Sequence, residues 1–366
     1  MTRRLAVLTC LGLLVTAAPT ATQSAADPVA ALISRLADGR VRLAKDGESG
    51  YLRSLLAALD VPVSSQSLTF VSSALQLKRV NAANPRALYF NDSVVVGWVR
   101  GGFIELVAQD ARRGLQFYSL EDRGGSPALV RESARCVGCH QARAGGIASL
   151  QVSATHARAF EDRFGGWYVT GRHGSAKHFG NWDFWEAGPP PPGTSLFNWE
   201  SLAGKVELAG YPSPYSDIVA LMVMQHRAHV TNAMNRVRER GAAGDVAALV
   251  DRMVFADERP LTAAIRGTSG FAEQFQAQGP RDGKGRSLRD LDLTRGLMRY
   301  PCSYLIYSPQ FDALPAPVQA AVYRRLWEVL SGGDRDAKYG RLALASRRAA
   351  IDILRATKRG LPAYYF

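Results

Sequence analysis

The residues whose types and spacing could do chemistry are Cys136-Val137-Gly138-Cys139-His140. Two cysteines three positions apart, with a histidine directly after the second, form the attachment motif for a c-type haem. The two thiols add across the vinyl groups of the porphyrin, and one helical turn separates the thiols suitably. The adjacent imidazole then lies under the ring, where it can ligate the iron as the proximal ligand. The motif therefore predicts one covalent haem c, held by Cys136, Cys139 and His140.

Two other interpretations of the cysteine pair are weaker. A structural zinc site needs a second pair of ligands at metal spacing, and Cys302 stands alone. A dithiol redox pair needs a βαβ context, which the neighbouring sequence does not indicate. We expect Cys302 to be a small buried side chain, because free cysteine is among the most buried residue types.

The ligand on the other side of the iron decides what such a haem does. A histidine or methionine there makes a six-coordinate electron-transfer haem, and an open position permits ligand binding or peroxide chemistry. Met222 and His226 are four positions apart in an apolar run, so they would share one face of a helix. Both are candidate distal ligands, and so are two histidines of a glycine-rich loop, His173 and His178.

In that loop, Arg172 and Lys177 are possible partners for the haem propionates. A core packing role is the alternative for each candidate, since methionines at helical spacing are usually packing residues. The sequence leaves the choice among these four residues and an open site unresolved.

The N-terminus indicates export from the cytoplasm. Arg3 and Arg4 precede an apolar run over residues 5–18, and small residues follow at 24–26. This pattern is typical of a cleaved secretory signal over residues 1–26, and the run is too short for a membrane span. We therefore expect a periplasmic or secreted protein with no integral membrane span.

The chain is basic, which bears on its partners. Its formal net charge is +13, and removal of residues 1–26 takes away two arginines and no acidic residue, which leaves +11. Such a surface favours docking of an acidic redox partner protein. Nucleic acid is excluded as an expected partner, because the charges are scattered and no basic-aromatic recognition motif occurs. The sequence does not indicate an oligomeric state.

The periodicity predicts an α+β fold. Residues 27–60 have helical spacing, and an antiparallel β meander follows over residues 68–70, 87–90, 93–100, 103–108 and 115–120, directly before the haem motif. A further strand is expected at 166–170. The C-terminal half is mainly helical, with helices expected over 215–240, 245–255, 261–276, 318–330 and 346–359.

Four prolines at 189–192 mark the best candidate boundary. The domain prediction is a β-rich haem-attachment region over 27–200 and a helical region over 201–366 packing on it. A single domain over 27–366 is the alternative, since about 340 residues can form either.

At its Cys-x-x-Cys-His motif the chain resembles c-type cytochromes. Longer stretches are similar to single-haem secreted bacterial proteins classed as cytochrome c-like, namely residues 85–102, 165–174, 216–226 and 300–315. This resemblance implies haem c binding and electron transfer. The small soluble cytochrome c differs, because its motif lies near the N-terminus, whereas here over a hundred mature residues precede it.

The sequence thus predicts an exported single-haem c-type cytochrome that transfers one electron at a time. A simple carrier needs less protein than this, so a haem-dependent peroxidase or oxidase is the first alternative. A haem-based sensor or binding module is the second. Whether the protein is an enzyme stays open at this level.

Overall fold

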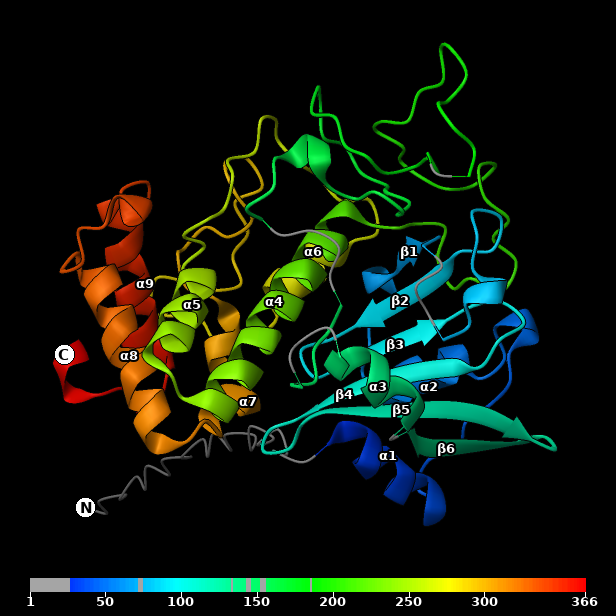
Figure 1. Ribbon diagram of the computed structural model, residues 1–366, viewed down its shortest axis with the longest axis horizontal. Coiled ribbons are helices and arrows are strands. Elements are labelled where there is room, and N and C mark those ends of the chain that lie inside the picture. The colour runs from blue at the N-terminus through cyan, green and yellow to red at the C-terminus, as the bar shows by residue number, and fades with distance from the viewer. Residues whose placement is uncertain (1–26, 72–74, 133, 143–145, 152–155, 185) are drawn as a thin grey trace, which may run out of the picture.

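The computed structural model describes residues 27–71, 75–132, 134–142, 146–151, 156–184 and 186–366. The expected signal segment, residues 1–26, lies outside the described residues. Figure 1 shows a sheet in the N-terminal half and a group of helices in the C-terminal half, which confirms the predicted α+β class.

The sheet is a six-stranded antiparallel meander in which each strand pairs with the next along the chain. Its strands are β1 (Ser67–Thr69), β2 (Arg86–Phe90), β3 (Val94–Trp98), β4 (Ile104–Asp110), β5 (Gly114–Arg123) and β6 (Ser126–Glu132). The predicted meander is therefore confirmed, with one strand added. The sequence did not indicate β6, because most of its residues are half-buried or exposed and it lacks a clear apolar alternation.

The two faces of the sheet contact different parts of the molecule, because alternate residues of a strand point to opposite faces. Tyr89, Val96 and Leu106 pack with residues of α1 (Pro28–Ala37) and α2 (Leu52–Ala58) in one core cluster. The opposite face presents Val107 and Phe117, and α3 (Ala134–Ala142) covers it there. In Figure 1, α3 lies in front of the sheet and α2 lies behind it.

Helix α4 (Ile218–Arg240) connects the sheet to the other helices. Its first ten residues are all buried, as expected for a helix that is apolar all round. It starts later than predicted, because Asp217 caps it by accepting hydrogen bonds from the backbone N–H groups of Val219 and Ala220. The helices that follow it are α5 (Ala243–Met253), α6 (Phe271–Ala277), α7 (Pro309–Asp312), α8 (Ala316–Ser331) and α9 (Leu344–Thr357). Of these, α5 and α6 pack directly on α4, and α8 packs on α5.

Two predicted elements were wrong. Residues 166–170 form isolated bridges instead of a strand, with Trp167 opposite Thr69 and Thr170 opposite Asp217. Residues 261–270 are not helical, and α6 covers only the last part of the predicted 261–276 helix. There the backbone N–H groups of Thr268 and Ser269 donate to the Asp217 carboxylate, which holds the chain in a loop.

Two smaller predictions are confirmed. Helices α5, α8 and α9 lie within a few residues of their predicted ranges. Near the C-terminus, Tyr365 is fully buried in the helical core, whereas Phe366 is exposed. Cys302 is fully buried, and burial raises the pKa of its thiol to about 12. No helix among the described residues has the length and apolar character that crossing a membrane requires.

Candidate haem-attachment site

The Cys-x-x-Cys-His motif lies on the short helix α3, directly after β6. Cys136 is half-buried and Cys139 is exposed, and three positions on a helix bring two side chains to neighbouring places on its surface. Gly138 between them is also exposed. The two thiols are thus one helical turn apart, with the second at the protein surface.

The ring of His140 is oriented by a backbone carbonyl. Its Nδ1 lies 2.6 Å from the carbonyl oxygen of Ser149. Since a carbonyl only accepts, Nδ1 carries the proton, and the lone pair of a neutral imidazole is then on Nε2. In return, the Ser149 hydroxyl and backbone N–H both donate to the carbonyl oxygen of His140, at 3.2 Å each. The two residues are thus joined by hydrogen bonds in both directions.

The protonation state of His140 also suits a metal ligand. Burial is the main cause that lowers the pKa of this imidazole, partly opposed by the hydrogen bond to Ser149. The ring is therefore neutral near pH 7. Metal-ligating histidines typically donate their other ring N–H to such an acceptor, which fixes the tautomer and the ring orientation.

A small apolar cluster surrounds the motif, separate from the two large cores. The ring of Phe117 in β5 lies 4.7 Å from the ring of His140, centroid to centroid. The cluster contains Leu115, Phe117, Leu150 and Ala228, with Val107, Cys136, Val137 and Ala148 partly buried against it. The sheet, helix α3, the segment after α3 and helix α4 thus all contribute to this wall.

Asn232 of α4 fixes the segment that carries Ser149. Its side-chain oxygen accepts from the backbone N–H of Leu150 at 2.7 Å, and its Nδ2 donates to the carbonyl of Leu150 at 2.8 Å. Because Leu150 follows Ser149 directly, this pair of bonds positions the carbonyl that orients His140. The chain of contacts runs from α4 through the loop to the motif histidine.

These residues fit a covalently attached haem. The thiols have the helical spacing that attachment needs, His140 presents Nε2 with its tautomer fixed, and the neighbouring wall is apolar. Among the described residues, no group of three or more His, Cys, Asp and Glu side chains could hold a metal ion by itself.

The structure places two of the four candidate distal ligands away from this cluster. His226 stacks on Phe255 with 4.4 Å between ring centroids, and its Nε2 lies 2.8 Å from the Ser303 hydroxyl. Residues two apart on an α-helix point about 200° apart, so His226 faces nearly opposite to Ala228. Met222 is fully buried in the helical core. Either side chain would have to leave this packing to ligate the iron.

The glycine-loop histidines lie side by side, with 4.8 Å between their ring centroids. His173 uses both nitrogens, since Nδ1 lies 2.7 Å from the Ala176 carbonyl and Nε2 accepts from the Asn198 N–H at 2.9 Å. His178 accepts from the Gly180 N–H through Nδ1, whereas its Nε2 is buried without a hydrogen-bond partner in the described residues. Burial lowers the pKa of His178 to about 3.

Sequence reasoning missed one buried histidine, His156, because no periodic pattern or motif surrounds it. Its ring lies 5.7 Å from that of His226, and neither of its nitrogens has a hydrogen-bond partner among the described residues. Its Nδ1 is 4.0 Å from a carboxylate oxygen of Glu258. Burial lowers the pKa of His156 well below its ordinary value, so this contact is not an ion pair near pH 7.

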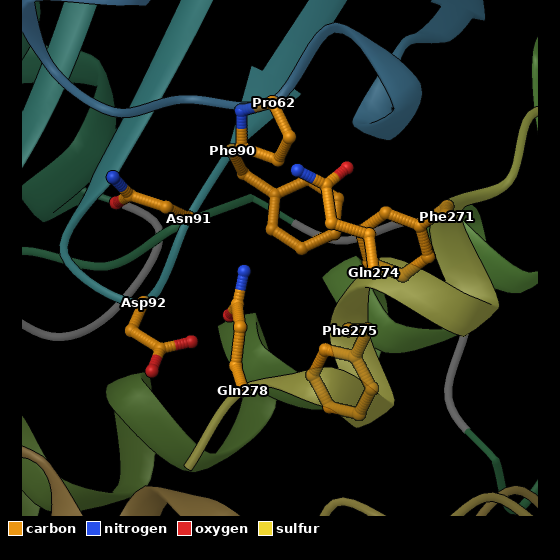
Figure 2. Close-up of a pocket in the computed structure, with 8 residues that line it drawn as sticks. All are labelled: Pro62, Phe90, Asn91, Asp92, Phe271, Gln274, Phe275 and Gln278. Atoms are coloured by element: carbon orange, nitrogen blue, oxygen red, sulfur yellow. The ribbon is translucent and has the colours of Figure 1, made fainter.

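A cavity at the edge of the sheet is distinct from the motif. Figure 2 shows that Phe90, Phe271 and Phe275 line this small space of about 20 Å³ beside Asp92 and Gln274. Two of its polar side chains already have partners, since Asp92 pairs with Arg289 and Gln274 accepts from Ser64. The rings of Phe90 and Phe271, 5.5 Å apart between centroids, join the sheet to α6 here, and we assign the cavity no chemistry.

Comparison of the chain with protein-family models, with curated proteins and with solved structures gave no match. The motif geometry therefore carries the functional argument without support from relatives.

Proposed function

We propose that the protein is an exported c-type cytochrome that binds one haem covalently and transfers single electrons outside the cytoplasm. One observation carries this proposal: the His140 Nδ1–H donates to the Ser149 carbonyl, which leaves Nε2 for ligation beside two thiols spaced for attachment. The chemistry that the haem would supply is a reversible one-electron change at its iron.

The protein's own residues would do three things for that group. Cys136 and Cys139 would hold it by thioether bonds, and His140 would ligate the iron. The apolar cluster formed by Leu115, Phe117, Leu150 and Ala228 would exclude water from the ligated side, which influences the reduction potential.

The exposure of the motif supports electron transfer to a partner protein. Gly138 and Cys139 are both exposed, so the attached edge of the haem would lie close to the protein surface. A partner could dock there without opening the fold. The expected net charge of +11 after signal removal favours an acidic partner protein, because attraction between opposite charges speeds the encounter of the two proteins.

An absorption spectrum tests the carrier function against the enzyme and sensor alternatives. We expect a low-spin ferric spectrum that cyanide leaves unchanged, and a reduced spectrum that carbon monoxide leaves unchanged, because a carrier keeps both axial positions ligated. A high-spin spectrum that shifts readily with either ligand would contradict the carrier function. Rapid peroxide turnover with an electron donor would then indicate a peroxidase.

A further inference from the structure

One peptide group lies between the proposed haem ligand and helix α4. It joins Ser149 to Leu150, so its carbonyl is that of Ser149 and its N–H is that of Leu150. The carbonyl accepts from the His140 Nδ1–H at 2.6 Å, and the N–H donates to the Asn232 Oδ1 at 2.7 Å. His140, this peptide group and Asn232 are therefore joined in line by two hydrogen bonds.

The side-chain amide of Asn232 fits this arrangement in one orientation only. Its Nδ2 donates to the Leu150 carbonyl at 2.8 Å, while its Oδ1 accepts from the Leu150 N–H. The opposite orientation would place donor against donor and acceptor against acceptor, so the network assigns the amide. Asn232 thus presents an acceptor oxygen to the peptide group on which His140 depends.

Helix α4 holds this acceptor beside the motif. Ala228 lies one turn before Asn232 on the same helix face, and Ala228 belongs to the apolar cluster against which Cys136 packs. The helix continues to Arg240, so Asn232 lies in its interior and not in a terminal turn that can fray. The acceptor is therefore placed by a regular element that also contacts the motif.

The two hydrogen bonds strengthen each other. When the N–H of a peptide group donates a hydrogen bond, more negative charge collects on its carbonyl oxygen, which becomes a better acceptor. The 2.6 Å between the His140 Nδ1 and this oxygen is shorter than the usual N–H···O distance of about 2.9–3.0 Å. A stronger bond from Nδ1–H in turn makes Nε2 a better electron donor to a metal.

We infer that Asn232 lowers the reduction potential of the attached haem, because it strengthens the hydrogen bond of His140 through the Ser149–Leu150 peptide group. A better electron donor at the iron favours the ferric form, which carries the higher positive charge. Asn232 is a positioning residue, since it acts through His140. This inference rests on the proposed function.

The test uses Asn232→Ala in the full-length exported protein with its haem attached. We expect a higher midpoint potential than in the wild type. We also expect the His140 Nδ1 proton of the reduced protein to exchange with solvent about fivefold faster, measured by NMR, because its hydrogen bond is weakened. Asn232→Asp keeps an acceptor for the Leu150 N–H, so it should restore slow exchange and a potential at or below the wild-type value.

Asn235→Ala is the matched control. Asn235 lies three residues later on the same helix and is fully buried, but its Oδ1 accepts from Gln310. Both readouts should therefore equal those of the wild type. If Asn232→Ala does not accumulate, Asn232→Ser takes its place with the same expected changes, because a serine hydroxyl on a helix bonds to the carbonyl four residues earlier.

The outcomes separate this inference from the proposed function. If haem is attached and the Asn232 variant leaves the potential and the exchange rate unchanged, the role given to Asn232 is wrong and the cytochrome proposal stands. A changed potential without faster exchange, or an equal change in Asn235→Ala, would contradict that role as well. If the wild-type protein carries no covalent haem, the proposed function itself fails.

Discussion

The side chain of Glu258 lies in a buried environment that disfavours its ionised form. Burial raises its pKa to about 7, although the nearby Arg163 and Arg341 and the hydrogen bond from the Leu297 N–H lower it. Asp292 acts in the same direction as burial, and the neutral ring of His156 lies 4.0 Å away. The folded protein therefore keeps this proton at pH values where an unfolded chain has released it.

The consequence is a stability that falls as pH rises. Below pH 4.5 both states hold the proton and Glu258 contributes nothing. Between pH 4.5 and about pH 7, Glu258 is ionised in the unfolded chain but still protonated in the folded protein, which favours unfolding. At about 1.4 kcal/mol per pKa unit, the free energy of unfolding falls by up to about 3 kcal/mol across this range. Above about pH 7 the difference stays constant.

Glu258→Gln tests this at the residue scale. The variant lacks the titration, so its stability relative to the wild type should increase from pH 4.5 to about pH 7 and then level off. Urea unfolding midpoints across this range measure the difference. His226, whose pKa is lowered by burial, titrates in both proteins and cancels in the comparison. A difference that does not change with pH would contradict the raised pKa.

At the residue scale, the sequence predicted the candidate motif residues but not their partners. Cys136, Cys139 and His140 are recognisable from spacing alone. The acceptor of the His140 Nδ1–H is a backbone carbonyl, and the residue that positions it, Asn232, lies over eighty positions downstream.

At the scale of elements, Asp217 connects helix α4 to the loop before α6. Its Oδ1 accepts from the N–H groups of Val219 and Ala220, and its Oδ2 accepts from those of Thr268 and Ser269. Asp217, Val219 and Ala220 are fully buried, so the two helix N–H groups have no access to water as a substitute for the carboxylate. One carboxylate thus starts the helix that supports the motif and fixes a distant loop.

Asp217→Ala should destabilise the protein by about 2–4 kcal/mol, since it removes a helix cap and leaves buried N–H groups unpaired. Urea denaturation measures the loss. Asp245→Ala is the control, because Asp245 lies in the first turn of α5 without being its N-cap residue. That change should stay within about 0.5 kcal/mol. Equal effects of the two substitutions would contradict the role given to Asp217.

Hydrophobic periodicity predicted best the strands and helices that are buried on one face only or on all sides. The alternation of β2 to β5 and the apolar start of α4 follow directly from their surroundings. Residues 261–270 failed, because their apolar spacing mimics a helix while Asp217 holds their backbone in a loop. Residues 166–170 failed because their pairing consists of two separate bridges, to Thr69 and to Asp217.

At the scale of the molecule, the candidate site lies where the sheet meets α4. One large core cluster joins the sheet to α1 and α2, and the other gathers around α4 and the C-terminal helices. The motif packs on a third, small cluster between them that includes Phe117 and Ala228. In Figure 1, α3 lies on the sheet near α4, so both halves of the chain support it. The predicted division near residue 200 remains a prediction.

The most direct test of the account is the mass of the peptide that contains Cys136 and Cys139, from protein exported by a host with haem-attachment machinery. We predict that this peptide carries the mass of one haem, and that Cys136→Ala with Cys139→Ala abolishes haem staining after denaturing electrophoresis. An unmodified peptide with two free thiols, from such a host, would contradict the central claim.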